Sequence, residues 1–329
     1  MLVNLCGGVN DALHSFSKFY KDTRFWETKD TRGGKVKVLA VPYTTAYGEP
    51  RARVLRDPDR DANPFFHLFE ALWMLGGRHD VEFLKQFNST IDQFSDDGAI
   101  LHGAYGYRWR HHFGYDQLEK VIEEIKKLPN TRRAVLSMWD AHVDPGIAAA
   151  GGRDVPCNTQ VYFSIKNDQL DMTVTCRSND AIWGCYGANA VHMSMLLEYT
   201  SLSTFIPMGR YYQMSNDLHV YERHWPLMAK FIEKDFIEDP YENGKWKFSP
   251  KLWIGGGKKA FDDDLERFLT NPYQIDYTTQ FMREIVAPMA IAFQSYKGGD
   301  IPMALDYLDR FGKYDWLNAA REWLERRVK

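Results

Sequence analysis

The sequence predicts an α/β protein in which helices pack on a mixed, largely antiparallel sheet and a helical carboxy-terminal extension follows. Apolar residues recur at helical spacing between residues 65 and 75. Two strand-like runs, 158–165 and 169–176, are joined by turn residues typical of a hairpin. Helical patterns fill the chain beyond residue 257. A strand-containing part followed by a run of helices is typical of this class.

The first half of the chain supplies two helices and a strand. The apolar repeat lies within residues 64–87, and Gly76-Gly77 stops it. A second helix is predicted for residues 116–127. Residues 131–139 are predicted to form a strand that begins with two arginines, and the Gly- and Ala-rich residues 143–154 to form a loop.

The middle of the chain supplies the remaining sheet and the longest helix. Lys166-Asn167-Asp168 connects the two strand-like runs as a hairpin turn. A helix is predicted for residues 188–203, a strand for 209–215, and a further extended segment for 217–221.

A glycine-rich stretch at residues 254–259 is the best internal boundary by composition. We therefore predict a main domain over residues 1–253 and a helical extension over residues 254–329 that packs on it. Helices in this last part are predicted near residues 278–296, 302–311 and 316–328.

Composition limits the classes of function. Lys and Arg number 41 and Asp and Glu 44, so the net charge of −3 does not favour nucleic-acid binding by counterion release. No apolar run reaches the roughly 20 residues of a membrane span, and the amino terminus lacks a signal-peptide pattern, so a cytoplasmic protein is expected. The four cysteines form no C-x-x-C pair, which predicts neither a metal site nor a disulfide framework.

Cys157 follows a proline at the start of a predicted strand, and Arg177 lies on the strand predicted to pair with it. A neighbouring guanidinium would lower the pKa of the thiol and favour a nucleophilic thiolate. The competing interpretation is a small, buried, inert cysteine.

Arg177-Ser178 places a planar, multi-donor cation beside a hydroxyl, as binding of a phosphate monoester requires. Arg132-Arg133 can add two more guanidinium groups, although surface ion pairs would also explain them. Asn189 carries a donor and an acceptor that match a pyrimidine edge, or it serves as a helix N-cap.

Glu70 lies in an apolar helix, where a buried carboxyl is suited to proton transfer or is a satisfied structural group. His219 and Tyr221 are two residues apart in an extended segment and so face the same side. They would bind a sugar hydroxyl, or they are hydrogen-bonded core side chains.

Several motifs stand together between residues 64 and 225: HLFEALWMLGG at 67–77, YGYRWR at 105–110, TRR at 131–133, Pro156-Cys157, RSND at 177–180 with Gly184, and DLHVY at 217–221. In these motifs and their order the chain resembles the thymidylate synthase superfamily, which includes the deoxycytidylate and deoxyuridylate hydroxymethylases of bacteriophages. The resemblance makes residues 1–253 a thymidylate synthase-like catalytic domain.

The resemblance implies an enzyme in which Cys157 adds to C6 of a pyrimidine nucleotide. C5 then attacks the one-carbon unit of 5,10-methylenetetrahydrofolate, and loss of the C5 proton with elimination of tetrahydrofolate leaves an exocyclic methylene. Glu70 and Tyr105 would organise the water and proton transfers.

The resemblance also implies the binding residues. Arg177, Ser178, Arg132 and Arg133 would hold the phosphate, the last two across a homodimer interface. Asn189 would read the base, His219 and Tyr221 would bind the 3'-hydroxyl, and Asp180, Trp73 and Trp139 would contact the folate. The family's amino-terminal phosphate loop is not recognisable, which leaves Arg51, Arg53 or Arg56 as substitutes.

Departures from the synthase pattern favour addition of water over reduction of the methylene. Asn158 replaces a histidine, Tyr162 replaces a glutamine, and residues 325–329 replace a short apolar tail. We therefore expect a C5 hydroxymethylase that acts on dUMP first and dCMP second, because Asn189 favours uracil. A thymidylate synthase and a catalytically silent nucleotide-binding homologue are the alternatives.

Overall fold

The structure is a computed structural model that describes residues 1–329 except 235–238, 243 and 329. Its strands are β1 (Leu2–Cys6), β2 (Trp26–Thr31), β3 (Gly34–Leu39), β4 (Tyr43–Tyr47), β5 (Val135–Ser137), β6 (Asn158–Lys166), β7 (Gln169–Cys176), β8 (Asn179–Asp180), β9 (Met208–Ser215) and β10 (Leu218–Tyr221).

The helices are α1 (Val9–Tyr20), α2 (Pro64–Leu75), α3 (Val81–Lys85), α4 (Tyr105–Tyr107), α5 (Gln117–Lys127), α6 (Asp144–Ala149), α7 (Asn189–Thr204), α8 (Trp225–Glu233), α9 (Lys258–Thr270), α10 (Ala287–Lys297), α11 (Ile301–Asp309) and α12 (Asp315–Glu325). A wide helical turn, Ala181–Ala188, leads into α7.

The central sheet has the strand order β1-β4-β9-β7-β6-β5 in the described part of the chain. β1 is parallel to β4 and β7 is parallel to β9, whereas the other neighbours are antiparallel. The mixed, largely antiparallel sheet predicted from the sequence is therefore confirmed. Asn167 and Asp168 have φ values of +50° and +59°, the conformation that the tight β6–β7 turn requires.

A smaller sheet, β2-β3-β10-β8, is continuous with the central one. β7 ends at Cys176 and β8 begins at Asn179, while β9 ends at Ser215 and β10 begins at Leu218. Residues 177–178 and 216–217 connect the two sheets side by side. Asn216 N–H donates to Cys176 O (2.8 Å) and Asn179 N–H donates to Asp217 O (2.8 Å). The Arg177-Ser178 pair therefore lies at the junction of the two sheets.

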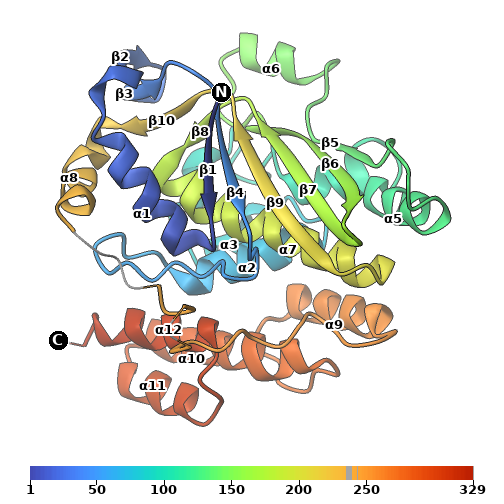
Figure 1. Cartoon of the computed structure of the whole chain (residues 1–329). Coiled ribbons are helices and arrows are strands. Elements are labelled where there is room, and N and C mark those ends of the chain that lie inside the picture. The colour runs from blue at the N-terminus through green and yellow to red at the C-terminus, as the bar shows by residue number, and fades with distance from the viewer. Residues whose placement is uncertain (235–238, 243, 329) are drawn as a thin grey trace.

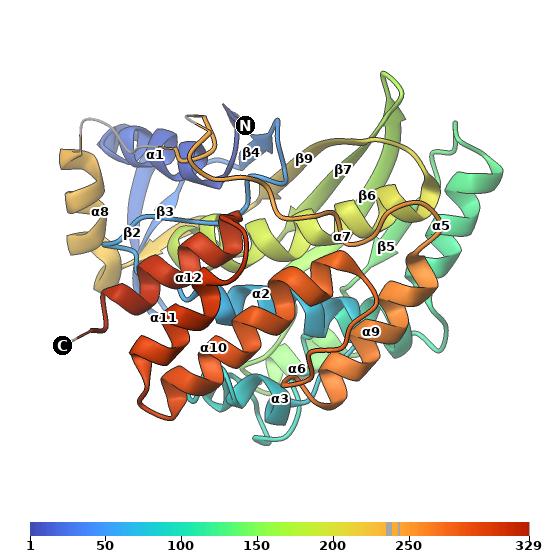
Figure 2. The ribbon, with the colours of Figure 1, turned by 90° about the horizontal axis from the view of Figure 1, so that it is seen from below.

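Helices cover the central sheet on one side in two layers. α7 packs on β7 and β9, and α2 packs on α7. α9, α10 and α12 contact the other side of α2, as Figure 2 shows from below. Both parts of the chain contribute to one contiguous apolar core. The division into two units at residue 253 stays a prediction.

α2 has the boundaries that its sequence predicts. The Asn63 side chain accepts a hydrogen bond from Phe66 N–H (3.1 Å), and Pro64 occupies the first turn, where its missing N–H has no consequence. Gly76 caps the end, and Gly77 follows with φ +72°, which a residue with a side chain rarely adopts.

Two predictions about the sheet edge were inaccurate. The strand predicted for residues 131–139 is limited to Val135–Ser137, because Thr131 N–H bonds back to Leu128 O and begins a turn. The loop predicted for residues 143–154 contains α6, in which Pro145 begins the helix and alanines favour it.

No element was predicted before residue 64, although β1–β4 and α1 lie there. Short strands carry little local pattern, and β4 is a strand largely because β1 and β9 flank it. None of the described helices is both long enough and apolar enough to cross a bilayer.

Candidate active site

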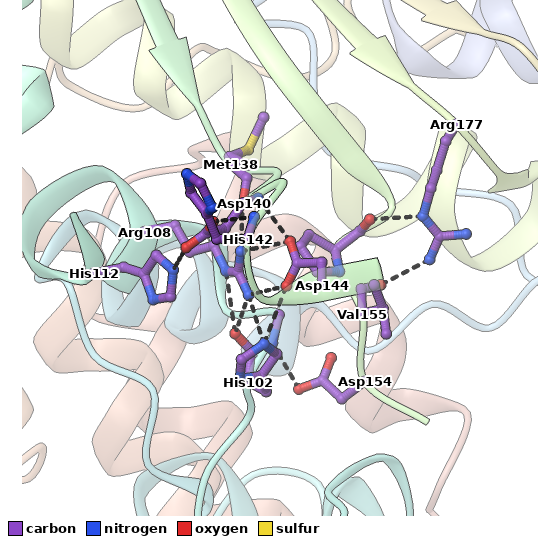
Figure 3. A network of polar contacts seen from close by, with 12 residues as sticks. His102, Arg108, His112, Met138, Asp140, His142, Asp144, Asp154, Val155 and Arg177 are labelled. Carbon is purple, nitrogen blue, oxygen red and sulfur yellow. Dashed lines mark hydrogen bonds and ion pairs between the residues drawn. The ribbon is translucent and has the colours of Figure 1, made fainter. Parts of the chain in front are cut away.

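Cys157 immediately precedes β6, and Arg177 immediately follows the neighbouring strand β7. Arg177 N–H donates to Cys157 O (2.9 Å), which fixes the two residues side by side. The Arg177 side chain reaches back along the chain: Nε donates to Pro156 O (2.9 Å) and Nη2 to Val155 O (2.9 Å). Figure 3 shows this return path. Nη2 also lies 3.9 Å from Cys157 Sγ, so the predicted pairing of thiol and guanidinium is present.

The predicted direction of the thiol's pKa shift is wrong for this structure. Burial raises the pKa of Cys157 above its usual range, and Asp154 adds to the rise, while Arg177 and Arg32 oppose it. The desolvation of a charged sulfur outweighs the two cations, even though the Cys157 side chain is only half-buried. The thiolate must therefore be stabilised further before it can attack.

Arg32 is a site residue that the sequence analysis missed. It lies in the turn between β2 and β3, and its guanidinium donates to Gly152 O (3.2 Å) and Arg153 O (3.3 Å). Gly33, beside it, lies so close to Tyr221 that a Cβ there would be 2.7 Å from the hydroxyl. The Arg-Gly-Gly run at residues 32–34 is the signal for a tight turn that presents an arginine.

Arg51, Arg53 and Arg56, proposed as phosphate ligands in place of a phosphate loop, have carboxylate partners. Arg53 forms a buried ion pair with Glu198 of α7, and Arg51 Nε lies 3.6 Å from the same carboxylate. Arg56 Nε lies 3.1 Å from Glu322 of α12. Arg32 is therefore a better candidate for an amino-terminal phosphate ligand than these three arginines.

A chain of side-chain amides crosses the floor of the site. Asn158 Nδ2 donates to Asn189 Oδ1 (2.9 Å), and Asn189 Nδ2 donates to Asn179 Oδ1 (3.1 Å). Gln213 Nε2 donates to Asn158 Oδ1 (3.1 Å), and Asn179 Nδ2 donates to Ser215 Oγ (3.0 Å). The amide of Asn189 is therefore held in one orientation, directly beneath the residue that follows Cys157.

The alternative role of Asn189 as an N-cap is wrong. Its backbone angles, φ −64° and ψ −36°, are already helical, and α7 begins without a side-chain cap. The wide turn Ala181–Ala188 continues into α7, so the helix start needs no separate cap.

His219 and Tyr221 share one side of β10, as predicted from their spacing, and their rings meet edge to face with centroids 5.0 Å apart. His219 Nδ1 lies 3.1 Å from Asp217 Oδ1, which orients the imidazole. Asp180, opposite His219 across the β8–β10 pair, accepts a hydrogen bond from Ile182 N–H (2.9 Å). Burial raises the pKa of Tyr221, and Cys157 is among the charges that act on it.

Tyr105 begins α4, and its hydroxyl accepts a hydrogen bond from Asn158 N–H (3.3 Å). Burial raises the pKa of this phenol well above its usual range, so the hydroxyl stays neutral. Gly106 makes this position possible, because a Cβ there would collide with the backbone of Met74 in α2.

Glu70 projects from α2 toward α7 and is only 9% exposed. Its Oε2 lies 2.9 Å from Nε2 of His192, a residue that the sequence analysis did not select. An isolated histidine within an apolar helix gives no local signal of a carboxylate partner.

The three remaining predicted residues differ in their surroundings. Ser178 is half-buried, and its carbonyl accepts a hydrogen bond from the Cys176 thiol (3.0 Å). Trp139 is half-buried, with the Arg177 guanidinium 5.7 Å from its ring centroid. Trp73 is fully buried and donates from Nε1 to Asp80 O (3.2 Å), and its role as a folate contact stays a prediction.

Arg132 and Arg133 are exposed and lie away from Cys157 of the same chain. Arg133 pairs with Glu124 at 2.8 Å. Ala134, the next residue, is level with Phe163 of β6, whose N–H donates to Ala134 O. Six residues along a strand separate Phe163 from Cys157, a distance of about 20 Å. A single chain therefore does not bring these arginines to its own thiol.

A buried polar network supports the segment before Cys157 (Figure 3). Arg108 forms a two-point ion pair with Asp144 (2.7 and 2.8 Å) and donates to Met138 O (2.7 Å). Asp154 accepts a hydrogen bond from Gly103 N–H (2.9 Å), where a Cβ on the glycine would be 2.6 Å from the carboxylate. Both ion-pair partners are fully buried, so their mutual charge compensation holds α6 and the end of β5 in place.

Comparison with known proteins places this geometry in a family. The family described as thymidylate synthase matches residues 65–283. The chain is 43% identical over 311 residues to a deoxyuridylate hydroxymethyltransferase of Pseudomonas phage M6, covering 91% of this chain and 87% of the relative. It is 38% identical over 200 residues to the deoxyuridylate hydroxymethyltransferase of Bacillus phage SP01, covering 58% of this chain and 51% of that one.

The fold has a solved counterpart in the thymidylate synthase of T4 phage, with a TM-score of 0.54 and 21% identity over 68% of this chain and 82% of that chain. The family match covers most of the chain, and the phage M6 relative matches nearly all of it. The chain belongs to the thymidylate synthase family.

Proposed function

We propose that this protein is a deoxyuridylate 5-hydroxymethyltransferase, which transfers a one-carbon unit to C5 of dUMP and completes the group with water. The observation that carries the proposal is a thiol next to the Arg177 guanidinium, with Arg32 as a second nearby cation, at the start of a strand whose first residue joins an oriented chain of side-chain amides. The extensive likeness to relatives that bear this name supports it.

The side chains around Cys157 suit covalent attack on a nucleotide. Sγ forms a bond to C6 of the pyrimidine, which makes C5 nucleophilic. Arg177 and Arg32 offer cations to the dianionic phosphate monoester, with Ser178 as a further donor. Tyr105 sits against the Asn158 N–H beside the sulfur, where a neutral phenol donates and accepts protons in turn.

The orientation of the Asn189 amide favours uracil over cytosine. Oδ1 already faces a donor, Asn158, and Nδ2 faces an acceptor, Asn179. Each atom retains capacity for a second bond on the base side, where Oδ1 accepts from N3–H and Nδ2 donates to O4 of uracil. Cytosine presents the opposite polarity at both positions.

5,10-Methylenetetrahydrofolate supplies the one-carbon unit when bound. We propose Asp180 and Trp139 as its contacts, together with Trp183. The Trp183 ring is 52% exposed and has the Arg60 guanidinium 4.1 Å from its centroid, which forms a flat platform for an aromatic ring. Arg60 Nη2 is buried and has no hydrogen-bond partner in the described part of the chain, which suits an anionic or carbonyl ligand.

We further propose a homodimer in which Arg132 and Arg133 reach the phosphate site of the partner chain. None of the described helices covers the face of the central sheet opposite α7 (Figure 1). Tyr162 on this face is 39% exposed, and Tyr212 and Met214 are half-buried. An apolar sheet face of this kind is suited to burial against a second copy.

The test is product analysis with C5-tritiated dUMP and 5,10-methylenetetrahydrofolate. We expect tritium release, 5-hydroxymethyl-dUMP by mass and tetrahydrofolate. Formation of dTMP with dihydrofolate would instead identify a thymidylate synthase, and absence of tritium release would identify a silent binding homologue. With dCMP in place of dUMP, we expect slow turnover.

Two serine variants provide matched controls. Cys157→Ser should abolish tritium release, because an alcohol at this position is a poor nucleophile. Cys6→Ser should remain active, because Cys6 Sγ donates to Ala46 O (3.2 Å) and a hydroxyl can make the same bond. Normal turnover by Cys157→Ser would refute the covalent mechanism.

A further inference from the structure

Glu70 and His192 form a buried acid–imidazole pair between α2 and α7. His192 Nε2 lies 2.9 Å from Glu70 Oε2, and His192 is only 3% exposed. Buried charged or polar groups are costly unless they are paired, so two such groups at contact distance require each other. Packing of α2 against α7 does not require a polar pair at this place, because most other buried residues of the two helices are apolar.

The pair lies one helical turn from the residue that reads the base. His192 follows Asn189 by three positions on α7, so both side chains project from the same face. Asn189 is bonded to Asn158, whose backbone N–H is bonded to the Tyr105 hydroxyl. The pair therefore lies one helical turn away from the hydrogen-bonded floor of the site.

The pair has unused hydrogen-bonding capacity. In the described part of the chain, neither Glu70 Oε2 nor the two ring nitrogens of His192 makes an aligned hydrogen bond, despite the short separation. Buried polar atoms are almost always satisfied in folded proteins. These atoms thus indicate a partner that arrives with the reaction, for which water is the right size.

A neutral histidine and a buried arginine lie close to the pair. His67, on α2 one turn before Glu70, has its pKa lowered to about 3 by burial, with the charges of Arg60 and His192 acting in the same direction. Arg60, itself buried, is the permanent cation on this side. A carboxylate such as that of Glu70 is a common general base in enzymes.

We propose that His192 is a positioning residue that holds Glu70 as the acceptor for the proton of the water that adds to the nucleotide, and so directs the reaction to a hydroxymethyl product. This inference rests on the proposed function. Oε2 of Glu70, which faces the imidazole, is also the oxygen with unused hydrogen-bonding capacity, so it is the oxygen that receives the attacking water.

The proposed step balances. The water oxygen bonds to the exocyclic methylene carbon, and the electron pair of the C5–methylene double bond moves toward O4. Glu70 takes the water proton. The electron pair then returns to form the C5–C6 double bond, the bond from C6 to Cys157 breaks, and the thiolate regains a proton. No oxidant or reductant is needed.

The test separates early steps from water addition. Tritium release from C5 reports every step up to the exocyclic methylene, and hydroxymethyl product reports the steps after it. In a single turnover with enzyme in excess, we expect the rate of tritium release by His192→Leu to stay within a few-fold of wild type, while the rate of product formation falls by about 100-fold, the range of general-base effects. Intact mass should show protein that retains the nucleotide with its added methylene. KM for dUMP should be unchanged.

His192→Gln, which keeps a hydrogen-bond donor at this place, should recover part of the product yield. His142→Gln, at an exposed histidine, should match wild type. A parallel loss of tritium release and product in His192→Leu, at an unchanged thermal midpoint, overturns the proposal. A wild-type enzyme that makes dTMP or releases no tritium overturns the proposed function instead, so the two failures are distinct.

If His192→Leu does not fold, the ratio of tritium release to product is measured in His192→Gln and His192→Asn instead. A raised ratio of tritium release to product supports the positioning role, and an unchanged ratio with full activity in the Gln variant and in His192→Asn refutes it.

Discussion

At Cys157, burial and positive charge act in opposite directions on the same sulfur. Burial raises the pKa of the thiol and the nearby arginines only moderate the rise. The same burial keeps the thiol protonated in the free protein. We therefore expect the Cys157 thiol to become reactive only when bound substrate completes the site.

Arg177→Gln should slow alkylation of Cys157. Loss of the guanidinium 3.9 Å from Sγ raises the pKa of the thiol further, so the rate with iodoacetamide at mildly alkaline pH should fall about three- to tenfold. Arg310→Gln, at an exposed helical arginine, should leave the rate unchanged, and Cys157→Ser gives the background. Equal rates for both arginine variants would show that Arg177 does not act on the sulfur.

His67 should contribute to the acid sensitivity of the fold. Its folded-state pKa of about 3 lies below the unfolded value of 6.5, so the unfolded chain takes up a proton first as pH falls. The stabilisation is complete above the unfolded pKa and is lost as pH falls toward the folded one. The loss is roughly 2 kcal/mol between about pH 6.5 and about pH 5.

Urea unfolding across this range measures the effect. His67→Gln should show a flatter dependence of the free energy of unfolding on pH than the wild type. His142→Gln, at an exposed histidine, should retain the wild-type slope. Identical slopes in all three proteins would contradict a buried, neutral His67.

At the scale of elements, the site depends on one close contact between helices. α4 approaches α2 so closely at Gly106 that a Cβ has no room against the Met74 backbone. This contact sets the height of Tyr105 above the Asn158 N–H and relative to Glu70 on α2. A single glycine thus fixes the position of Tyr105 relative to the helix that carries Glu70.

Gly106→Ala should therefore lower both stability and activity. The added methyl must displace backbone, which costs about 1–3 kcal/mol or more, and kcat should fall as Tyr105 moves. Gly146→Ala in α6, where a Cβ meets open space, is the matched control and should be neutral or slightly stabilising. Differential scanning calorimetry and steady-state kinetics test both variants; equal effects of the two substitutions would exclude the steric explanation.

At the scale of the whole molecule, the proposed active site extends beyond one chain. Arg132 and Arg133 lie just before β5, about 20 Å along the sheet from Cys157. An uncovered sheet face lies beside them. A dimer that pairs through this face would explain both the uncovered face and the distance between these arginines and Cys157 of the same chain.

Subunit complementation tests this arrangement. Cys157→Ser and the double variant Arg132→Ala with Arg133→Ala should each be nearly inactive alone. After mixing and exchange, about one quarter of the sites should be active, because half of the dimers are mixed and each has one intact site. No recovery, with mixed dimers shown by native mass spectrometry, would place the arginines outside the partner's site.

The sequence correctly predicted the elements that are set by interactions between residues close together in the chain. The β6–β7 hairpin, α2 and α5 were predicted because their turns, caps and apolar periods are local. The amino-terminal strands were not, because β4 acquires its strand character from β1 and β9. The pairing of Cys157 with Arg177 followed from the hairpin alone.

The sequence by itself predicted the fold class, the family resemblance and the candidate nucleophile, since the motif residues and the hairpin register are local features of the chain. Only the tertiary structure decided that burial raises the pKa of that nucleophile, that Arg32 joins it from a distant turn, and that Glu70 faces His192. These depend on desolvation and on contacts between helices and strands far apart in the chain, which no local pattern encodes.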